Sequence, residues 1–245
     1  MALVPARDIL EIATIAGYGV VTVAPGSLDL ARVVLAAALE EQAPILIGAL
    51  AQAPEDFLAQ LRELCEQAQS PVALHCLGNN GGDPFALVEQ GFGSLSISHV
   101  GPDRALNLEE TTTAVSAAQE AGLWAEAGLG WDAMDHDPDA GAAFARNCGC
   151  NAIAVDPGGS PLDIDELYAL ANRLIAFPLA VADPEMASQG HGDGLENWIR
   201  RAAHMGVCRV DVTLQVEAAF DAGGEQGAKA CIQEFMTTLG SKGRW

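Results

Sequence analysis

Short apolar runs alternate with amphipathic stretches along the whole chain. Each apolar run comes just after a Pro, Gly or Asn and has the length of a buried strand, whereas most amphipathic stretches begin at a residue that favours a helix N-terminus. The apolar runs predict eight strands, at residues 20–23, 45–47, 72–74, 95–97, 123–125, 152–155, 179–181 and 207–212. The amphipathic stretches predict helices at residues 27–41, 54–67, 107–120, 138–146, 163–174, 195–205 and 225–239.

The predicted strands are apolar on both faces. Parallel strands that lie under helices have this pattern, because both faces of their sheet are buried. The alternation allows a doubly wound open sheet or a closed (β/α)8 barrel, and periodicity does not distinguish them. No G-x-G-x-x-G motif follows the first predicted strand, which counts against dinucleotide binding. The length of 245 residues suits a barrel, and no linker divides it, so residues 1–245 are expected to form one domain.

Composition and charge narrow the classes of partner. Hydrophobic residues make up 50% of the chain, enough for a large core, and the net charge is -21 at pH 7. Such a chain repels polyanions, so neither nucleic acid nor an anionic membrane surface is expected to bind. The N-terminus has no apolar signal core, and no apolar run reaches the ~18 residues of a membrane span. We therefore expect a cytoplasmic protein.

The cysteines and lysines limit the possible chemistry further. The six cysteines are expected to be reduced thiols in the cytoplasm. Cys148 and Cys150 form a C-x-C motif, but no second cysteine pair has the spacing of a zinc site. The chain has two lysines, Lys229 and Lys242, both near the C-terminus. Their position excludes a Schiff-base lysine inside a barrel.

Several segments resemble one known family. They are residues 3–20, 44–47, 71–75, 90–95, 126–130, 151–160 and 205–212. Over these segments the chain is similar to the class II, metal-dependent fructose- and tagatose-bisphosphate aldolases. The resemblance covers nearly the whole chain and implies a (β/α)8 TIM barrel that assembles as a homo-oligomer, either a dimer or a tetramer. It also implies a divalent metal on three histidines, which polarises the ketose carbonyl, and a carboxylate acid/base after the third strand.

The metal-binding positions of that family are changed in this chain. After the third strand the family reads H-L-D-H-G and this chain reads H-C-L-G-N, so His75 matches the first histidine. Leu77 then stands in place of the acid/base and Gly78 in place of the first metal histidine. By the same alignment, Pro161 and Ala182 stand in place of the second and third metal histidines. The resemblance thus implies that the zinc site is lost, and no cofactor is expected.

Other family positions are kept, lost or displaced. The family has an E-G-E-L-G motif after the fifth strand. Its first glutamate is present here as Glu126, whereas Gly128 replaces its second glutamate. Asp211 stands where the family has a substrate-binding asparagine. The loop after the seventh strand is longer than in the family, and it contains His191. His191 is therefore the one alternative candidate for a metal ligand.

The residues at the C-terminal ends of the strands are the candidate site, because barrel enzymes build their sites there. The candidate catalytic residues are His75, Glu126 and Asp156, and the candidate substrate-binding residues are His99, Ser160, Asp183 and Asp211. Four of these side chains are carboxylates and none is a lysine or arginine. Such a site would repel a sugar bisphosphate.

Three interpretations of this acidic site stay open. It is the remnant of a site in an inactive scaffold, regulatory or partner subunit; a rebuilt divalent-metal site with His75 and His99; or a pocket for a neutral or cationic small molecule. The first predicts a family member that has lost zinc-dependent aldol cleavage. The alternative is a divergent lyase with a rebuilt acidic site. Retention of the family's own reaction would require His191 as a replacement ligand.

Overall fold

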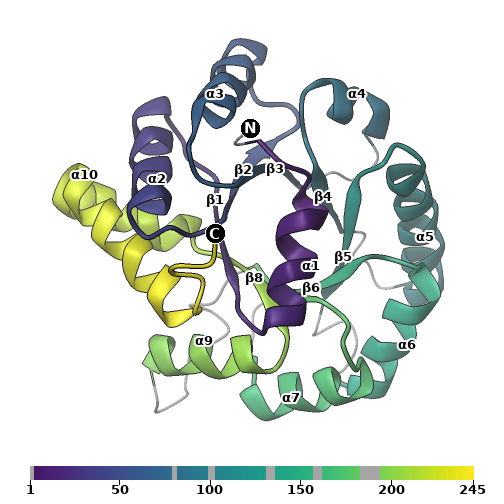
Figure 1. Cartoon of the computed structure of the whole chain (residues 1–245). Coiled ribbons are helices and arrows are strands. Elements are labelled where there is room, and N and C mark those ends of the chain that lie inside the picture. Colours follow the sequence, from purple (N-terminus) through teal and green to yellow (C-terminus); the bar gives the residue numbers. More distant parts are fainter. Residues whose placement is uncertain (1–2, 79–81, 99–102, 131–135, 157–161, 183–193) are drawn as a thin grey trace.

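A ring of eight parallel strands forms the centre of the computed structural model, which describes residues 3–78, 82–98, 103–130, 136–156, 162–182 and 194–245. The strands pair in chain order, and β8 closes the ring on β1 (Figure 1). Their bounds are β1 Val20–Val23, β2 Ile45–Leu50, β3 Val72–Leu77, β4 Ser94–Ile97, β5 Trp124–Gly130, β6 Ala152–Asp156, β7 Leu179–Val181 and β8 Val207–Asp211. The prediction of a (β/α)8 barrel is confirmed, and the doubly wound sheet is excluded.

Helices surround this ring (Figure 1). Their bounds are α1 Ala6–Ala16, α2 Leu28–Glu40, α3 Glu55–Gln67, α4 Pro84–Glu89, α5 Arg104–Glu120, α6 Pro138–Cys148, α7 Ile164–Arg173, α9 Gly194–His204 and α10 Thr213–Thr238. The exception is α1, which lies across the end of the barrel that faces the viewer. Among the described helices, none has both the length and the apolar character of a membrane span.

Most predicted helices begin where a capping residue was expected. The Ser27 hydroxyl accepts a hydrogen bond from the backbone N–H of Leu30 (3.2 Å), and Asp163 caps α7 in the same way. The start of α5 and the presence of α4 differ from the prediction. Helix α5 begins three residues before Asn107, because Asp103 supplies its cap. Helix α4 was not predicted, because its six residues are too few to show a helical period of apolar positions.

Helix α10 begins much earlier than the predicted residue 225. It consists of two helical pieces that meet at Gly224, whose φ of 60° and ψ of -153° are not helical. The predicted helix corresponds to the second piece. The pair Gly223-Gly224 comes just before the predicted start, and in the structure it forms a kink inside a longer helix.

Two apolar layers hold the barrel together. The larger layer fills the space between the strands and the outer helices, as alternation along each strand requires. The smaller layer lies inside the barrel at its N-terminal end, where Ile9, Leu10 and Ala13 of α1 pack against interior side chains such as Leu46 and Trp124. Helix α1 therefore closes this end, and only the opposite, C-terminal end is available for a site.

An irregularity in β8 changes which side chains face the interior. Leu179 of β7 pairs with Val207, and the next residue, Ala180, pairs with Arg209, so β8 has one extra residue, Cys208. Cys208 belongs to the interior layer beside α1, whereas Val207 and Val210 face the outer layer. Such a bulge re-aims side chains. Here it directs both Cys208 and Arg209 into the barrel.

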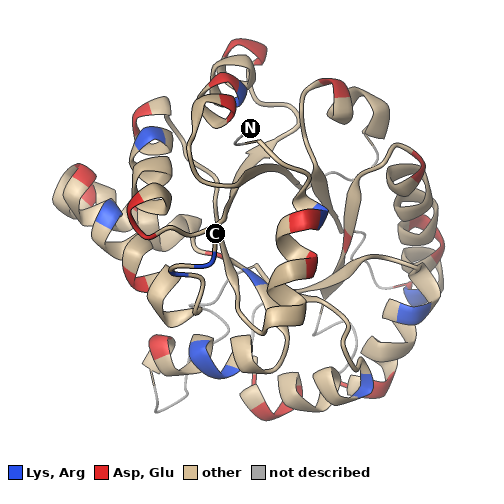
Figure 2. Cartoon of the chain, viewed as in Figure 1, with Lys and Arg blue, Asp and Glu red and all other residues tan. Residues whose placement is uncertain are grey.

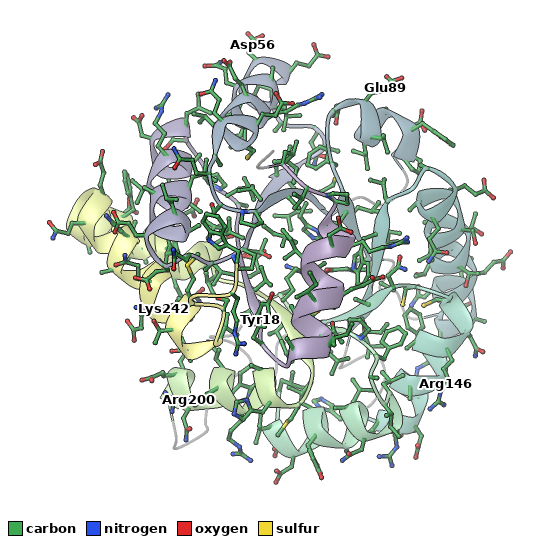
Figure 3. The ribbon with its side chains drawn as sticks, viewed as in Figure 1. Tyr18, Asp56, Glu89, Arg146, Arg200 and Lys242 are labelled. Carbon is green, nitrogen blue, oxygen red and sulfur yellow. The ribbon has the colours of Figure 1, made fainter. Side chains whose placement is uncertain are left out.

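The charged side chains are distributed mainly on the outside. Acidic positions are spread over the outer helices, with fewer basic ones among them (Figure 2). Asp56, Glu89, Arg146 and Arg200 point away from the barrel (Figure 3). Among the described residues, the buried charged side chains are Glu126 and Arg209, with exposed fractions of 0% and 1%. These two residues lie in the barrel interior and define the candidate site.

Candidate functional site

Glu126 of β5 is held by Arg209 of β8 across the barrel. Arg209 Nε donates to both carboxylate oxygens of Glu126, at 3.0 Å and 2.9 Å, and Nη2 lies 2.8 Å from Oε2. Burial lowers the pKa of Arg209, but the negative charges of Glu126 and Asp211 outweigh this effect, so the pKa is raised and the guanidinium stays charged. The predicted catalytic carboxylate is therefore one half of a buried ion pair.

His75 of β3 is fully buried between two serines of β4. Its Nδ1 lies 2.8 Å from Ser94 Oγ, and its Nε2 lies 2.9 Å from Ser96 Oγ. Burial, followed by the positive charge of Arg209, holds the pKa of His75 well below its usual value. The imidazole is thus neutral at physiological pH.

Ser96 connects His75 to the ion pair. Its Oγ donates to Glu126 Oε2 at 3.4 Å, and His75 Nε2 lies 4.0 Å from the same oxygen. Because a serine has a single hydroxyl proton, Ser96 Oγ accepts from His75 Nε2–H, and His75 Nδ1 accepts from Ser94. One hydrogen-bonded network therefore runs from β3 through β4 and β5 to Arg209 of β8.

Three buried polar atoms near this network have no hydrogen-bond partner in the described structure. They are Arg209 Nη1, Thr22 Oγ1 and Trp124 Nε1. Thr22 pairs with Asp211 and lies two residues along β1 from Val20, the partner of Arg209. An unsatisfied buried donor or acceptor costs about 1–3 kcal/mol, so a water molecule or a ligand atom is expected to meet such groups.

Asp211, a predicted substrate-binding residue, interacts with the start of α10. Its Oδ1 accepts from the backbone N–H of Thr213 at 3.0 Å and from Thr213 Oγ1 at 2.6 Å. Thr213 Oγ1 in turn accepts from the backbone N–H of Ala24 at 2.8 Å. One carboxylate oxygen of Asp211 is therefore used to order the junction of β1, β8 and α10.

The remaining predicted site residues fall partly outside the described structure. Asp156 ends β6, where it pairs with Gly130 of β5, but its side chain is not among those described. The other four, His99, Ser160, Asp183 and His191, lie outside the described residues. The structure thus brings together His75 and Glu126 of the predicted set. Asp211 is the last residue of β8, two residues after Arg209.

Sequence reasoning missed Arg209, Ser94 and Ser96. Arg209 lies two positions before Asp211, and Ser94 and Ser96 alternate with apolar residues along β4, so alternation could have placed them on the interior face of their strands. Arg209 lies inside β8 and not at its C-terminal end, where barrel enzymes place their site residues. The interior therefore contains a cation, Arg209, whereas the predicted site residues included neither lysine nor arginine.

The end of β3 is where the family resemblance expects an acid/base and a metal ligand. Leu77 is the last residue of β3, and Gly78 follows it, exposed and with a φ of 63°. Neither side chain, nor that of Ala182 after β7, has an atom that can bind a metal. Within the described ranges, no group of three or more His, Cys, Asp and Glu residues is close enough to hold a metal ion. Leu77, Gly78 and Ala182 therefore supply no zinc ligand at the positions that the family resemblance indicates.

Comparisons with known proteins agree with this architecture. The family described as "Fructose-bisphosphate aldolase class-II" matches residues 4–238. A fructose-bisphosphate aldolase of Thermus caldophilus is 24% identical over 90% of this chain and 86% of its own length, and one of Xanthobacter flavus is 25% identical over 71% and 63%.

Solved structures show the same fold. The YdjI aldolase of Escherichia coli K12 superposes with a TM-score of 0.81 at 21% identity, covering 99% of each chain. A fructose-bisphosphate aldolase of Campylobacter jejuni gives a TM-score of 0.75 at 14% identity, covering 97% of this chain and 94% of its own. Since the family match spans nearly the whole sequence, the chain belongs to the class II fructose-bisphosphate aldolase family.

Proposed function

We propose that this protein is a class II aldolase-family barrel that has lost zinc-dependent cleavage of sugar bisphosphates and acts as a regulatory or partner subunit. The observation that carries the proposal is the end of β3. Leu77 and Gly78 occupy the positions of an acid/base and a metal ligand in the family resemblance, and neither can transfer a proton or bind zinc.

The backbone at Gly78 supports the proposal. A φ of 63° lies in the left-handed region, which costs a residue with a Cβ about 1–2 kcal/mol. A Cβ at Gly78 would meet nothing within 4 Å, so the restriction is conformational and not steric crowding. The local chain therefore favours glycine over a residue with a Cβ at this position.

The interior polar residues support it as well. Glu126 and His75 are each satisfied by neighbours within the barrel, and His75 is neutral. The two lysines are outside the barrel, where Lys229 pairs with Glu40 and Lys242 with Glu41. A bisphosphate requires several cations or helix N-termini, and the guanidinium of Arg209 is already paired with a carboxylate.

An aldol-cleavage assay tests the proposal. The full-length protein is incubated with Zn²⁺ or Co²⁺ and either fructose or tagatose bisphosphate, with the Thermus caldophilus enzyme as a positive control. We expect no triose phosphate above the metal-only blank. Metal-dependent cleavage that disappears in His191→Ala would overturn the proposal and establish His191 as a replacement ligand.

A second candidate function is supported by the unsatisfied polar atoms. Arg209 Nη1 and Thr22 Oγ1 are buried without partners, and an oxygen of a neutral polyol or amide would satisfy the guanidinium N–H. The barrel would then bind a neutral or cationic small molecule, with or without turnover. A thermal-shift screen of polyols, amides and amines tests this function, because a ligand at 100 times its Kd stabilises by about 2.7 kcal/mol. Stabilisation by none of them would reject it.

A further inference from the structure

Cys148 and Cys150 form a close pair of thiols far along the chain from the network of His75 and Glu126. Cys148 is the last residue of α6, and Cys150 lies just before β6. Their Sγ atoms are 3.3 Å apart, and both side chains are buried, with exposed fractions of 1% and 6%. The two sulfur atoms are therefore in contact inside the layer between the strands and the outer helices.

Gly149 produces this contact. It ends α6 in the left-handed conformation, with φ of 69° and ψ of 16°, and so turns the chain between the two cysteines. The turn is fixed from α5, because Gln119 Nε2 donates to the carbonyl of Gly149 at 2.9 Å. Asn151, the next residue after the pair, accepts through Oδ1 from the backbone N–H of Ala125 at 2.9 Å. The proximity of the thiols is thus built into the turn.

The other four cysteines are placed differently. They are Cys65 on α3, Cys76 on β3, Cys208 on β8 and Cys231 on α10. Cys76 faces the outer layer and Cys208 the interior layer, and among the described hydrogen bonds the one that joins two thiols is that of Cys148 and Cys150. Burial raises the pKa of Cys65 to about 12 and that of Cys208 to about 12. The thiols of Cys65 and Cys208 are therefore less readily ionised than an ordinary cysteine.

The contact makes the two thiols of the pair unequal. The hydrogen bond between the two thiols lowers the pKa of Cys148 despite the opposing effect of burial. The same hydrogen bond, together with burial, raises the pKa of Cys150. Cys148 is therefore the thiol that ionises first, and the thiolate is the nucleophile in disulfide exchange.

We propose that Cys148 and Cys150 are a reversible dithiol–disulfide couple that exchanges with low-molecular-weight disulfides such as oxidised glutathione. The Cys148 thiolate attacks one sulfur of the disulfide and releases one thiolate. The Cys150 thiol then loses its proton, attacks Cys148 Sγ and releases the second thiolate. The two cysteines are oxidised to one disulfide, and the small disulfide is reduced to two thiols.

The geometry favours a reversible couple over a permanent cross-link. A disulfide needs the sulfur atoms about 2.05 Å apart, so closure requires a further approach that the Gly149 turn must absorb. The ring it closes spans residues 148–150, so little chain entropy is removed from the unfolded state. Strained disulfides with little stabilisation have more oxidising potentials and are readily reduced. The pair precedes β6 at the N-terminal end of the barrel, so the inference is independent of the proposed function.

Thiol mapping of the full-length protein tests the proposal. The protein is equilibrated in mixtures of reduced and oxidised glutathione, quenched with acid, and alkylated in denaturant. Trypsin leaves both cysteines in the peptide of residues 147–173, which has no other cysteine. We expect this peptide to lose two hydrogen atoms in mass as the glutathione becomes oxidised, to resist alkylation, and to recover with dithiothreitol.

Cysteine variants provide the controls. Cys148→Ser and Cys150→Ser should each abolish the intramolecular disulfide, whereas Cys65→Ser, at another buried thiol, should retain it. The proposal is overturned if residues 147–173 stay fully alkylated at every glutathione ratio, if a glutathione mixed disulfide is the end product, or if the disulfide joins other cysteines. Because the wild-type peptide map decides among these outcomes, the test does not depend on the variants folding.

Discussion

Glu126 and Arg209, separated by 83 residues in the chain, form a two-pronged ion pair through the interior of the barrel. The pair joins β5 to β8, which are separated in the ring by β6 and β7, and leaves the interior without net charge from these two groups. Through Ser96 it also orients the neutral imidazole of His75. The polar atoms of His75 and Glu126, the two predicted catalytic residues described here, thus have hydrogen-bond partners within the barrel.

Removing one partner of this pair should be strongly destabilising. Arg209→Met leaves the Glu126 carboxylate buried without a partner charge, and Glu126→Gln leaves the Arg209 guanidinium in the same state. Each substitution should lower the free energy of unfolding by about 3–5 kcal/mol. The double variant should recover a large part of that loss, because no unpaired charge remains. Urea unfolding of the three variants measures these differences.

A surface ion pair provides the matched control. Arg200 and Glu196 on α9 are exposed, so Arg200→Ala should change the free energy of unfolding by about 0–1 kcal/mol. If Arg209→Met were as mild as this control, the interior pair would not be a structural link, and its proposed role would be wrong.

His75 should make stability depend on pH on the acidic side. The pKa of His75 is lowered in the folded protein, so below the ordinary histidine pKa of about 6.5 the unfolded chain binds a proton that the folded chain does not. Stability is therefore retained above that pH and is lost as the pH falls below it, by up to about 1.4 kcal/mol per pH unit. Subtracting the pH profile of His75→Gln from that of the wild type isolates this contribution. A flat difference would show that His75 protonates equally in both states.

Gly78 should resist substitution for a conformational reason. Gly78→Ala places a Cβ at a φ of 63° and should lower the free energy of unfolding by about 1–2 kcal/mol. Gly223 in α10 is the matched control: its φ is not positive, and a Cβ there meets nothing within 4 Å. Gly223→Ala should therefore be neutral or stabilising by up to ~1 kcal/mol. Equal effects at both sites in thermal denaturation would contradict the conformational argument.

Asp211 should stabilise the start of α10 through Thr213. Asp211→Ala removes the acceptor for the N–H and hydroxyl of Thr213 and should cost about 0.5–2 kcal/mol. Asp211→Asn keeps an acceptor oxygen and should retain most of the stability. The comparison is made by chemical denaturation. If both variants had full stability, the contact with Thr213 would contribute nothing, and a role in binding would become the better explanation for Asp211.

The sequence pattern predicted the strands and most helices because burial on both faces leaves an unmistakable apolar run. It did not distinguish a barrel from an open sheet, since closure depends on the pairing of β8 with β1, which are far apart in the chain. The family resemblance supplied that choice. The start of α10 at Thr213 was missed because Gly223 and Gly224 imitate a helix boundary.

The sequence placed His75 and Glu126 at strand ends, but in the structure they lie within β3 and β5, because both strands extend further than the predicted apolar runs. His75 and Glu126 were identified from the strand ends, yet their partners come from β4 and β8 and follow from the closed ring. The extra residue Cys208 shifts the register of β8 beside β7, and no local pattern reveals such a bulge. The contact of Asp211 with Thr213, by contrast, is local and could have been derived from the D-x-T spacing.

Zinc soaked into crystals of the full-length protein tests the central claim most directly. Anomalous scattering at the zinc edge locates every bound ion, including any at the C-terminal end of the barrel. We predict no zinc held there by three or more protein ligands, with the carboxylate of Glu126 still paired with Arg209. A tetrahedral zinc at that end, with His191 and other side chains about 2.0–2.2 Å away, would contradict the account and restore zinc-dependent aldol cleavage as the function.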